Sequence, residues 1–157
     1  MHRDEFVQRY GGLYEHSPWV AERVFDNGGV PGRDSLAELL ADCVETATRD
    51  EKLALIRAHP DLAGKAAIDG ELTAASTTEQ RSARLDQCTV DEYEKFLALN
   101  DQYREKFGFP FVMAVSNSDR EQILEAFALR LENDPATEFN TAISEIHKIA
   151  RLRLEAL

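Results

Sequence analysis

The chain has 157 residues, of which 43% are hydrophobic and 30% are charged, so it is long enough to bury one hydrophobic core. Its 18 Lys and Arg residues against 29 Asp and Glu residues give a formal net charge of −11. This charge argues against nucleic acid and anionic membranes as partners, because both attract a positively charged surface. An anionic ligand could bind only where local Arg or His residues outweigh the overall charge.

The cysteine content and the N-terminus predict a cytoplasmic protein. Cys43 and Cys88 are too few for a disulfide framework and lack the spacing of a redox or zinc motif, so we expect two reduced thiols. Residues 1–5 are too charged for a signal peptide. No segment approaches the roughly 18 consecutive apolar residues of a membrane-spanning helix, so we expect no membrane association.

Helix-start signals recur along the chain. Four hydroxyl residues precede a glutamate by three positions, the capping-box pattern that satisfies free backbone amides. These residues are Ser35, Ser76, Thr89 and Ser118. Two more predicted starts place a capping side chain before a proline, at Ser17-Pro18 and Asp134-Pro135.

Apolar residues recur at helical spacing between these signals. The predicted helices cover residues 3–13, 18–27, 36–48, 51–58, 77–86, 90–106, 119–132 and 135–156, with a further short helix over 61–68. The Gly-rich turn at 27–32 is predicted to be a surface loop. We therefore predict one all-α domain over residues 1–157, a bundle of about eight helices.

A histidine stands at a forced break between two of these helices. His59 precedes Pro60 in the run Ala58-His-Pro-Asp-Leu-Ala-Gly64, and a residue before proline disfavours the α conformation. With an unperturbed pKa near 6.5, its imidazole can transfer a proton at neutral pH. His59 is therefore a candidate catalytic residue. The alternative is a histidine that ends a helix and binds its last carbonyls.

Ser76, Glu79 and Gln80 form a second candidate cluster at a predicted helix start. A helix N-terminus offers free amides to polar ligands, and these side chains could present donors and acceptors to a small heterocycle. The alternative is that Ser76 and Glu79 serve only as a capping box.

One dense apolar run, residues 107–115, falls outside the helical periodicity. Pro110 cannot donate to a sheet, and a single strand has no partner, so we predict a buried, extended connector or an irregular helix start.

Arg153 interrupts the apolar stripe of the last predicted helix. It lies seven residues after Ile146 and three after Ala150, in the middle of that stripe. A guanidinium on the core side needs an anionic partner, because an unpaired buried charge is costly. The alternatives are a structural salt bridge, an arginine in the last turn that turns toward solvent, and an arginine that captures a carboxylate or urea-like carbonyl.

The chain offers no pattern for other common chemistries. No histidine pair has metal-ligand spacing, and neither cysteine joins one, so no metal site is predicted. There is no glycine-rich phosphate loop and no activated nucleophile. We therefore expect chemistry without a cofactor.

Taken together, four motifs resemble the OHCU decarboxylase family, whose enzymes act on 2-oxo-4-hydroxy-4-carboxy-5-ureidoimidazoline in urate catabolism. The N-terminal run at 10–22 is similar to the family's first signature, and the His59 segment resembles its catalytic-histidine segment. Ser76-x-x-Glu79-Gln80 and residues 106–111 resemble its next two motifs. Residues 149–154 are similar to the end of its last helix, so the resemblance covers nearly the whole chain.

The resemblance implies an all-α fold, a cofactor-independent carboxy-lyase, a homodimer and a ureidoimidazoline substrate that is converted to (S)-allantoin. It implies three catalytic residues: His59, Glu79 and Arg153. It also implies six substrate-binding residues: Pro60, Ser76, Gln80 and, through their backbone, Phe111, Val112 and Met113. Relatives often carry a cysteine within 112–115, where this chain has Val-Met-Ala-Val.

Two alternatives of other classes remain open. One is a non-catalytic helical module that binds a small ureide through His59, Glu79 and Arg153. The other is a purely structural helical protein in which the same residues end a helix, cap a helix and form an ion pair. Turnover of the ureidoimidazoline by the wild-type chain separates the enzyme from both.

Overall fold

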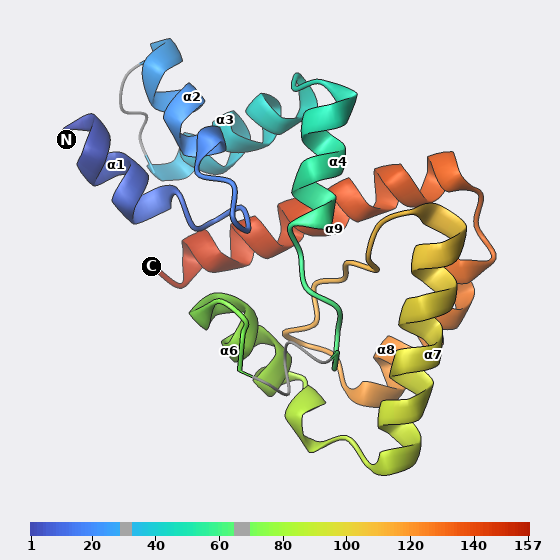
Figure 1. The fold of residues 1–157 in the computed structure, drawn as a ribbon. Coiled ribbons are helices and arrows are strands. Elements are labelled where there is room, and N and C mark those ends of the chain that lie inside the picture. Colours follow the sequence, from blue (N-terminus) through green and yellow to red (C-terminus); the bar gives the residue numbers. More distant parts are fainter. Residues whose placement is uncertain (29–32, 65–69) are drawn as a thin grey trace. The chain divides into compact units, whose positions relative to one another are not determined.

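The computed structural model describes residues 1–28, 33–64 and 70–157. Within these ranges the chain forms eight α-helices and one short 3₁₀ helix, with no β-strand (Figure 1). The elements are α1 (Arg3–Tyr10), α2 (Trp19–Gly28), α3 (Arg33–Glu45), α4 (Arg49–Arg57), α6 (Ala74–Ser82), η1 (Leu85–Gln87), α7 (Val90–Phe107), α8 (Arg120–Leu131) and α9 (Pro135–Glu155). The predicted all-α class is confirmed.

Several helices begin where the sequence predicted. Thr89 caps α7, where its hydroxyl accepts from the Glu92 amide at 3.1 Å and the Glu92 carboxylate accepts from the Thr89 amide. Asp134 precedes α9 and accepts from the Thr137 amide at 2.8 Å. These side chains satisfy amides that have no partner in the first helical turn.

The predicted caps of α3 and α8 are wrong. Ser35 is the third residue of α3, because that helix begins at Arg33. At α8 the cap is Asp119 rather than Ser118, since the Asp119 carboxylate accepts from the Gln122 amide at 2.8 Å. Ser118 and Asp119 are neighbouring capping residues, and local sequence does not distinguish them.

Two predicted segments lie partly outside the described residues. In the predicted surface loop at 27–32, residues 29–32 are outside them, whereas Asn27 and Gly28 end α2, so that part of the prediction is wrong. Of the predicted helix at 61–68, residues 65–68 are outside them. Residues 61–64 form a turn rather than a helix, so that part of the prediction is wrong.

The described residues form two compact units. The first unit contains residues 1–58 and 146–157, and the second contains residues 59–145. Helix α9 therefore contributes its C-terminal half to the first unit and its N-terminal half to the second. The single domain expected from the sequence stays a prediction.

In the first unit, α2 packs against both α1 and α3. The Phe6 side chain of α1 is fully buried, and its ring lies 5.4 Å from that of Phe25 in α2. His147 is held between two polar partners: Tyr14 Oη is 2.8 Å from Nδ1, and Glu45 Oε1 is 2.8 Å from Nε2.

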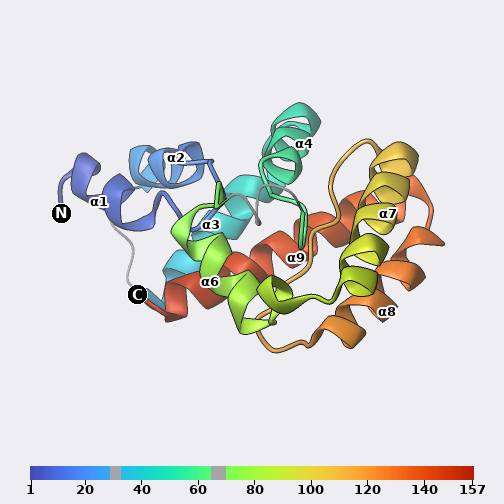
Figure 2. The same ribbon diagram turned by 60° about the horizontal axis from the view of Figure 1, so that its bottom comes forward.

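In the second unit, α7 and α8 lie side by side (Figures 1 and 2). Aromatic rings fill the space between them and the start of α9. Tyr103 is fully buried and contacts the rings of Phe107, Phe109, Phe111 and Phe127. Phe111 and Phe127 stack at 3.9 Å with an interplanar angle of 9°. This aromatic cluster is the core of the unit.

The connector between α7 and α8 is non-helical, so of its two predicted forms the irregular helix start is wrong. Gly108 ends α7 with φ 78°, a left-handed conformation that favours glycine, and residues 109–115 then follow without helical structure. Phe109, Phe111, Val112 and Val115 of this connector are buried.

Among the described residues, no helix is both long enough and apolar enough to span a bilayer.

The start of α4 generates a prediction about pH. A side-chain hydrogen bond from Arg23 lowers the pKa of Glu51 to about 2, and the Thr48 amide adds to this effect. The folded state therefore favours the carboxylate, and this stabilisation is present above the unfolded pKa of roughly 4.3. It is lost as the pH falls toward 2.

We expect Glu51→Gln to lower the Tm at pH 7, and the difference from wild type to vanish near pH 2. Glutamine can still serve in the capping box, so the variant removes mainly the charge. Asp50→Asn, in the same helical turn, is the matched control. A Tm difference for Glu51→Gln that does not change with pH would contradict the ion pair.

Candidate functional site

The His59 segment begins where α4 ends. Ala58 caps the C-terminus of α4, and His59 is the first residue of the second unit. The helix stops there because Pro60 disfavours the α conformation of the preceding residue. Because α4 ends at Arg57, the predicted helix break before Pro60 is confirmed. The His59 side chain is buried, with 7% of its surface exposed.

The turn after His59 is tight. Ala63 has φ 51°, a left-handed conformation that costs a non-glycine residue roughly 1 kcal/mol or more. A Cβ on Gly64 would lie 2.8 Å from the Cβ of Asp61, so a larger residue at this position would force a shift. Ala63 needs additional contacts to hold its conformation, and Gly64 allows the chain to pass close to Asp61.

Side chains from α6 and α7 clamp this turn. The Gln80 carboxamide accepts from the Ala63 amide at 3.0 Å and donates to the Asp61 carbonyl at 3.2 Å. Asn100 donates to the Leu62 carbonyl at 3.0 Å. Three consecutive residues after Pro60 are thus fixed by two buried amide side chains. The clamp sets the direction in which the chain leaves His59.

An ion pair reinforces the clamp. Arg104, one turn after Asn100 on α7, donates to the Asp61 carboxylate at 2.6 Å. More than half of the Arg104 side chain is exposed, so this pair contributes less than the buried amides.

The predicted capping role of Ser76 and Glu79 is wrong. Helix α6 begins at Ala74, and Thr73 is its cap, with its hydroxyl accepting from the Ser76 amide at 3.2 Å. Ser76 is the third helical residue, so it does not cap the helix. Thr73 competes successfully because it offers the same hydroxyl group three residues earlier, in an extended conformation with ψ 158°.

This correction places the predicted site residues of α6 within one helix. Ser76 and Glu79 are separated by three residues, and Ser76 and Gln80 by four, so all three share one face. Ser76 and Gln80 are buried. Side chains of this face reach the His59 turn, as the bonds of Gln80 show. The face therefore brings Gln80 to the turn that follows the candidate catalytic histidine.

Arg153 lies in the first unit, near the end of α9. Its side chain is 8% exposed, so the alternative of an arginine turned toward solvent is wrong. Nη1 donates to the Gly12 carbonyl at 3.0 Å, and Nη2 pairs with the Glu15 carboxylate at 3.4 Å. The Glu15 side chain is itself 3% exposed. The predicted anionic partner thus comes from the N-terminal motif.

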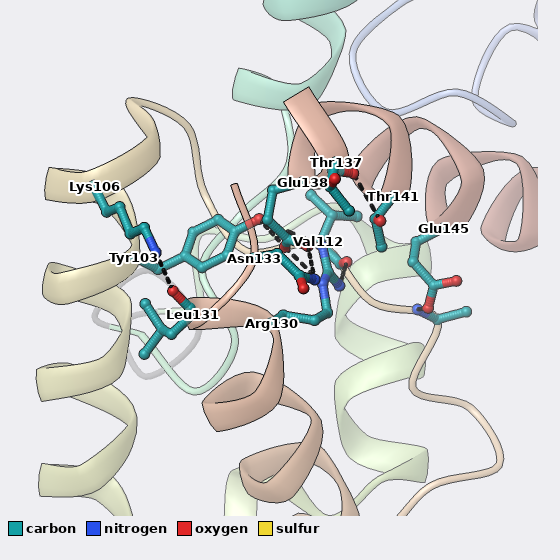
Figure 3. Close-up of polar contacts among 11 residues, drawn as sticks. Tyr103, Lys106, Val112, Arg130, Leu131, Asn133, Thr137, Glu138, Thr141 and Glu145 are labelled. Atoms are coloured by element: carbon teal, nitrogen blue, oxygen red, sulfur yellow. Dashed lines mark hydrogen bonds and ion pairs between the residues drawn. The ribbon is translucent and has the colours of Figure 1, made fainter. Parts of the chain in front are cut away.

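The backbone of the connector at Phe111–Met113 is held from its buried side. Arg130 of α8 donates to the Val112 carbonyl at 2.6 Å (Figure 3). Glu145 of α9 accepts from the Ala114 amide at 3.3 Å. In both ribbon views the connector passes close to the turn after His59 (Figures 1 and 2).

Sequence reasoning missed Asn100, Arg130 and Glu138. Arg130 follows Ile123 by seven residues and Phe127 by three, so it interrupts an apolar stripe just as Arg153 does. Glu138 precedes the buried Ala142 by four residues and has the same signal. A search of every predicted helix for charged residues within its apolar stripe identifies both Arg130 and Glu138. Asn100 gives no comparable signal, because an amide among polar neighbours is unremarkable.

Two further features bear on ligands. Among the described residues, no group of three or more His, Cys, Asp and Glu side chains is arranged to hold a metal ion. A cavity of about 480 Å³ borders α6 and the turn after His59, lined by residues that include Ala63, Thr77, Gln80, Arg81 and Tyr93. His59 and Glu79 do not line this cavity.

Comparisons with known proteins cover nearly the whole chain. A family model described as OHCU decarboxylase matches residues 1–155. The 2-oxo-4-hydroxy-4-carboxy-5-ureidoimidazoline decarboxylase of Haloferax volcanii is 46% identical over 151 residues, which cover 96% of this chain and 88% of that protein.

Two solved structures have a similar fold. A crystal structure of (S)-allantoin synthase matches with a TM-score of 0.80 and 32% identity; the match covers 99% of this chain, which spans half of that longer chain. A crystal structure of OHCU decarboxylase in the presence of (S)-allantoin matches with a TM-score of 0.73 over 98% of this chain and 96% of that one. At 21% identity, this second likeness shows the fold alone.

The clamp on the His59 turn generates a stability prediction. We expect Gln80→Met to reduce the free energy of unfolding by roughly 1–3 kcal/mol, because it leaves the Asp61 carbonyl and the Ala63 amide unpaired. Urea unfolding measures the loss. Arg81→Met, at the neighbouring exposed position, is the control. If the two variants are equally stable, the clamp does not hold the turn.

The buried ion pair between Arg153 and Glu15 in the first unit generates a second stability prediction. Arg153→Met should cost roughly 3–5 kcal/mol, because the Glu15 carboxylate stays buried without its cation. The double variant Glu15→Gln/Arg153→Met should recover part of this loss, since it removes the unpaired charge. Urea unfolding of the four proteins in the cycle gives the coupling, and simple additivity would show that the two residues do not interact.

Proposed function

Because the chain belongs to the OHCU decarboxylase family, we propose that it decarboxylates 2-oxo-4-hydroxy-4-carboxy-5-ureidoimidazoline to (S)-allantoin in urate catabolism. The observation that carries this proposal is the extent of the family match. Residues 1–155 include every segment assigned to the site. A buried histidine on a clamped turn, beside a polar helix face, suits an enzyme that moves a proton.

The chemistry of the substrate explains why side chains suffice. One ring carbon carries both a carboxylate and a hydroxyl group, and the neighbouring carbon is part of a C=N bond. The electron pair released with CO₂ can move into that C=N bond, so the substrate supplies its own electron sink. The protein must orient the carboxylate, take up the hydroxyl or nitrogen proton, and let a proton reach one face of the neighbouring carbon.

We assign the proton transfer to His59. Its position directly before Pro60 and the bonds that hold the following turn limit the movement of its backbone. A general acid or base held in this way contributes roughly 10²- to 10⁴-fold to the rate. Glu79 is proposed to hold the imidazole or the ureido group. Arg153 is proposed to bind ring or ureido oxygens, for which its planar fork of donors is suited.

The remaining site residues are proposed to bind the substrate. Ser76 and Gln80 would present polar groups from α6, and Pro60 would line the pocket next to His59. A carboxamide can make up to four hydrogen bonds, so the two bonds of Gln80 to the turn leave capacity for a ligand. Phe111, Val112 and Met113 would contact the substrate through their backbone.

We further propose that the protein acts as a homodimer in the cytoplasm and binds no nucleic acid. The free thiols of Cys43 and Cys88 suit a reducing compartment, and the net charge of −11 opposes binding to a polyanion. Sedimentation equilibrium at micromolar concentration tests the dimer.

The test of function compares two matched histidine substitutions. Substrate is generated in situ from urate by urate oxidase and hydroxyisourate hydrolase, and the product is followed by optical rotation. We expect the wild-type protein to give (S)-allantoin, and His59→Asn to lower kcat by roughly 10²- to 10⁴-fold. His16→Asn is the control, because His16 is exposed and asparagine tolerates its φ of 47°.

Racemic allantoin formed at the uncatalysed rate by the wild-type protein would rule out the enzyme. If the wild-type protein then still bound (S)-allantoin in calorimetry, the non-catalytic binding module would be the better account. If it bound nothing, the structural alternative would remain.

A further inference from the structure

Arg130 reaches into the core of the second unit with only 11% of its side chain exposed, and its guanidinium contacts several groups at once (Figure 3). Nε pairs with the Glu138 carboxylate at 2.8 Å, and Nη1 donates to the Val112 carbonyl at 2.6 Å. Its central carbon lies 4.3 Å from the centre of the Phe111 ring. The same side chain therefore fixes two consecutive residues of the connector.

The partners of Arg130 are fixed in turn. Glu138 has no exposed surface and accepts from Tyr103 Oη at 2.6 Å and from Asn133 Nδ2 at 2.9 Å. Burial and the hydrogen bond to Glu138 raise the pKa of Tyr103, so the hydroxyl remains a donor at any ordinary pH. The side chains of Tyr103, Arg130 and Asn133 all donate to Glu138, so the guanidinium has little freedom to move.

Stability alone is a weak explanation for this network. Removing two charges from water costs several kcal/mol each, and replacing a buried ion pair by apolar residues of similar volume is often neutral or stabilising. The surrounding aromatic cluster could accept such residues. An apolar residue could not, however, bind the Val112 carbonyl. The distinctive effect of the buried pair is therefore on the direction of the connector backbone.

That direction follows from peptide geometry. In a planar trans peptide, the carbonyl of one residue and the amide of the next point in opposite directions. With the Val112 carbonyl held toward Arg130, the Met113 N–H must point away from it. Exposure agrees with this orientation, since Val112 is 3% exposed whereas Met113 is half-buried. Glu145 holds the next amide, that of Ala114, at 3.3 Å.

We propose that Arg130, locked by Glu138, is a positioning residue that presents the Met113 amide to an acceptor oxygen of the substrate. The acceptor is a ring or ureido carbonyl oxygen, which a backbone N–H binds without adding charge to the site. This inference rests on the proposed decarboxylase function, and it assigns to Arg130 an action through the Val112–Met113 peptide rather than a contact with substrate.

The first experiment compares Arg130→Lys with Arg120→Lys. Arg120 makes the same kind of contacts elsewhere in the unit, with Nε on Glu92 at 2.9 Å and Nη1 on the Arg84 carbonyl at 3.0 Å. A lysine keeps the charge in both variants but cannot bind both partners as a fork. We expect Arg130→Lys to lower kcat/KM roughly tenfold and to raise the inhibition constant of (S)-allantoin by a similar factor. For Arg120→Lys we expect both constants to stay within twofold of wild type.

The second experiment removes the amide itself. Met113→Pro deletes the N–H without touching Arg130, and the non-helical connector suits a proline. We expect it to match Arg130→Lys in both constants, and the double variant to be no worse than either single variant, because both lose the same hydrogen bond. Met113→Pro still decides the question if Arg130→Lys does not fold, as judged by circular dichroism.

The outcomes separate the two proposals. A wild-type protein without turnover removes the proposed function before any variant is compared. An active wild type overturns the role of Arg130 if Arg130→Lys stays within twofold of Arg120→Lys, if Met113→Pro keeps the wild-type constants, or if the losses in the double variant multiply.

Discussion

Backbone hydrogen bonding outside the helices is the constraint on which this structure depends. Buried amides and carbonyls must find partners, and helices supply their own, but a buried non-helical segment does not. Among the described residues of the second unit, two such segments are the turn after His59 and the connector at 109–115. In both, side chains from neighbouring helices supply the partners, and the same bonds fix the segments that carry the proposed chemistry.

The two segments are held by different means. The His59 turn is clamped by neutral amides, Gln80 and Asn100, which bind carbonyls and an amide without burying a charge. The connector is held by a guanidinium, whose charge requires the fully buried Glu138 as a counterion. An arginine costs more to bury but extends further and binds several acceptors at once. Rigid helices thus position two short stretches of irregular backbone, as an enzyme that must place a proton and orient a carboxylate requires.

The sequence predicted the helical frame well and the site contacts poorly, for physical reasons. Helical periodicity is local, so seven of the eight helices in the described residues both begin and end within three residues of the predicted bounds, and α6 deviates by four at its end. Thr73 rather than Ser76 caps α6 because two equivalent hydroxyls compete, and local sequence cannot rank them. Arg153 stood out because a charge interrupted an apolar stripe. Gln80 and Asn100 bind carbonyls 19 and 38 residues away, and such contacts become visible only in the folded chain.

The most direct test of this account is a titration of the ¹⁵N-labelled wild-type protein with (S)-allantoin, followed by the backbone amide signals. If the two irregular segments form the site, the largest shifts will fall on the amides of residues 59, 61–63 and 111–113. Shifts confined to the part of the α6 cavity that is formed by Leu85, Val90 and Tyr93 would contradict the account and move the site there.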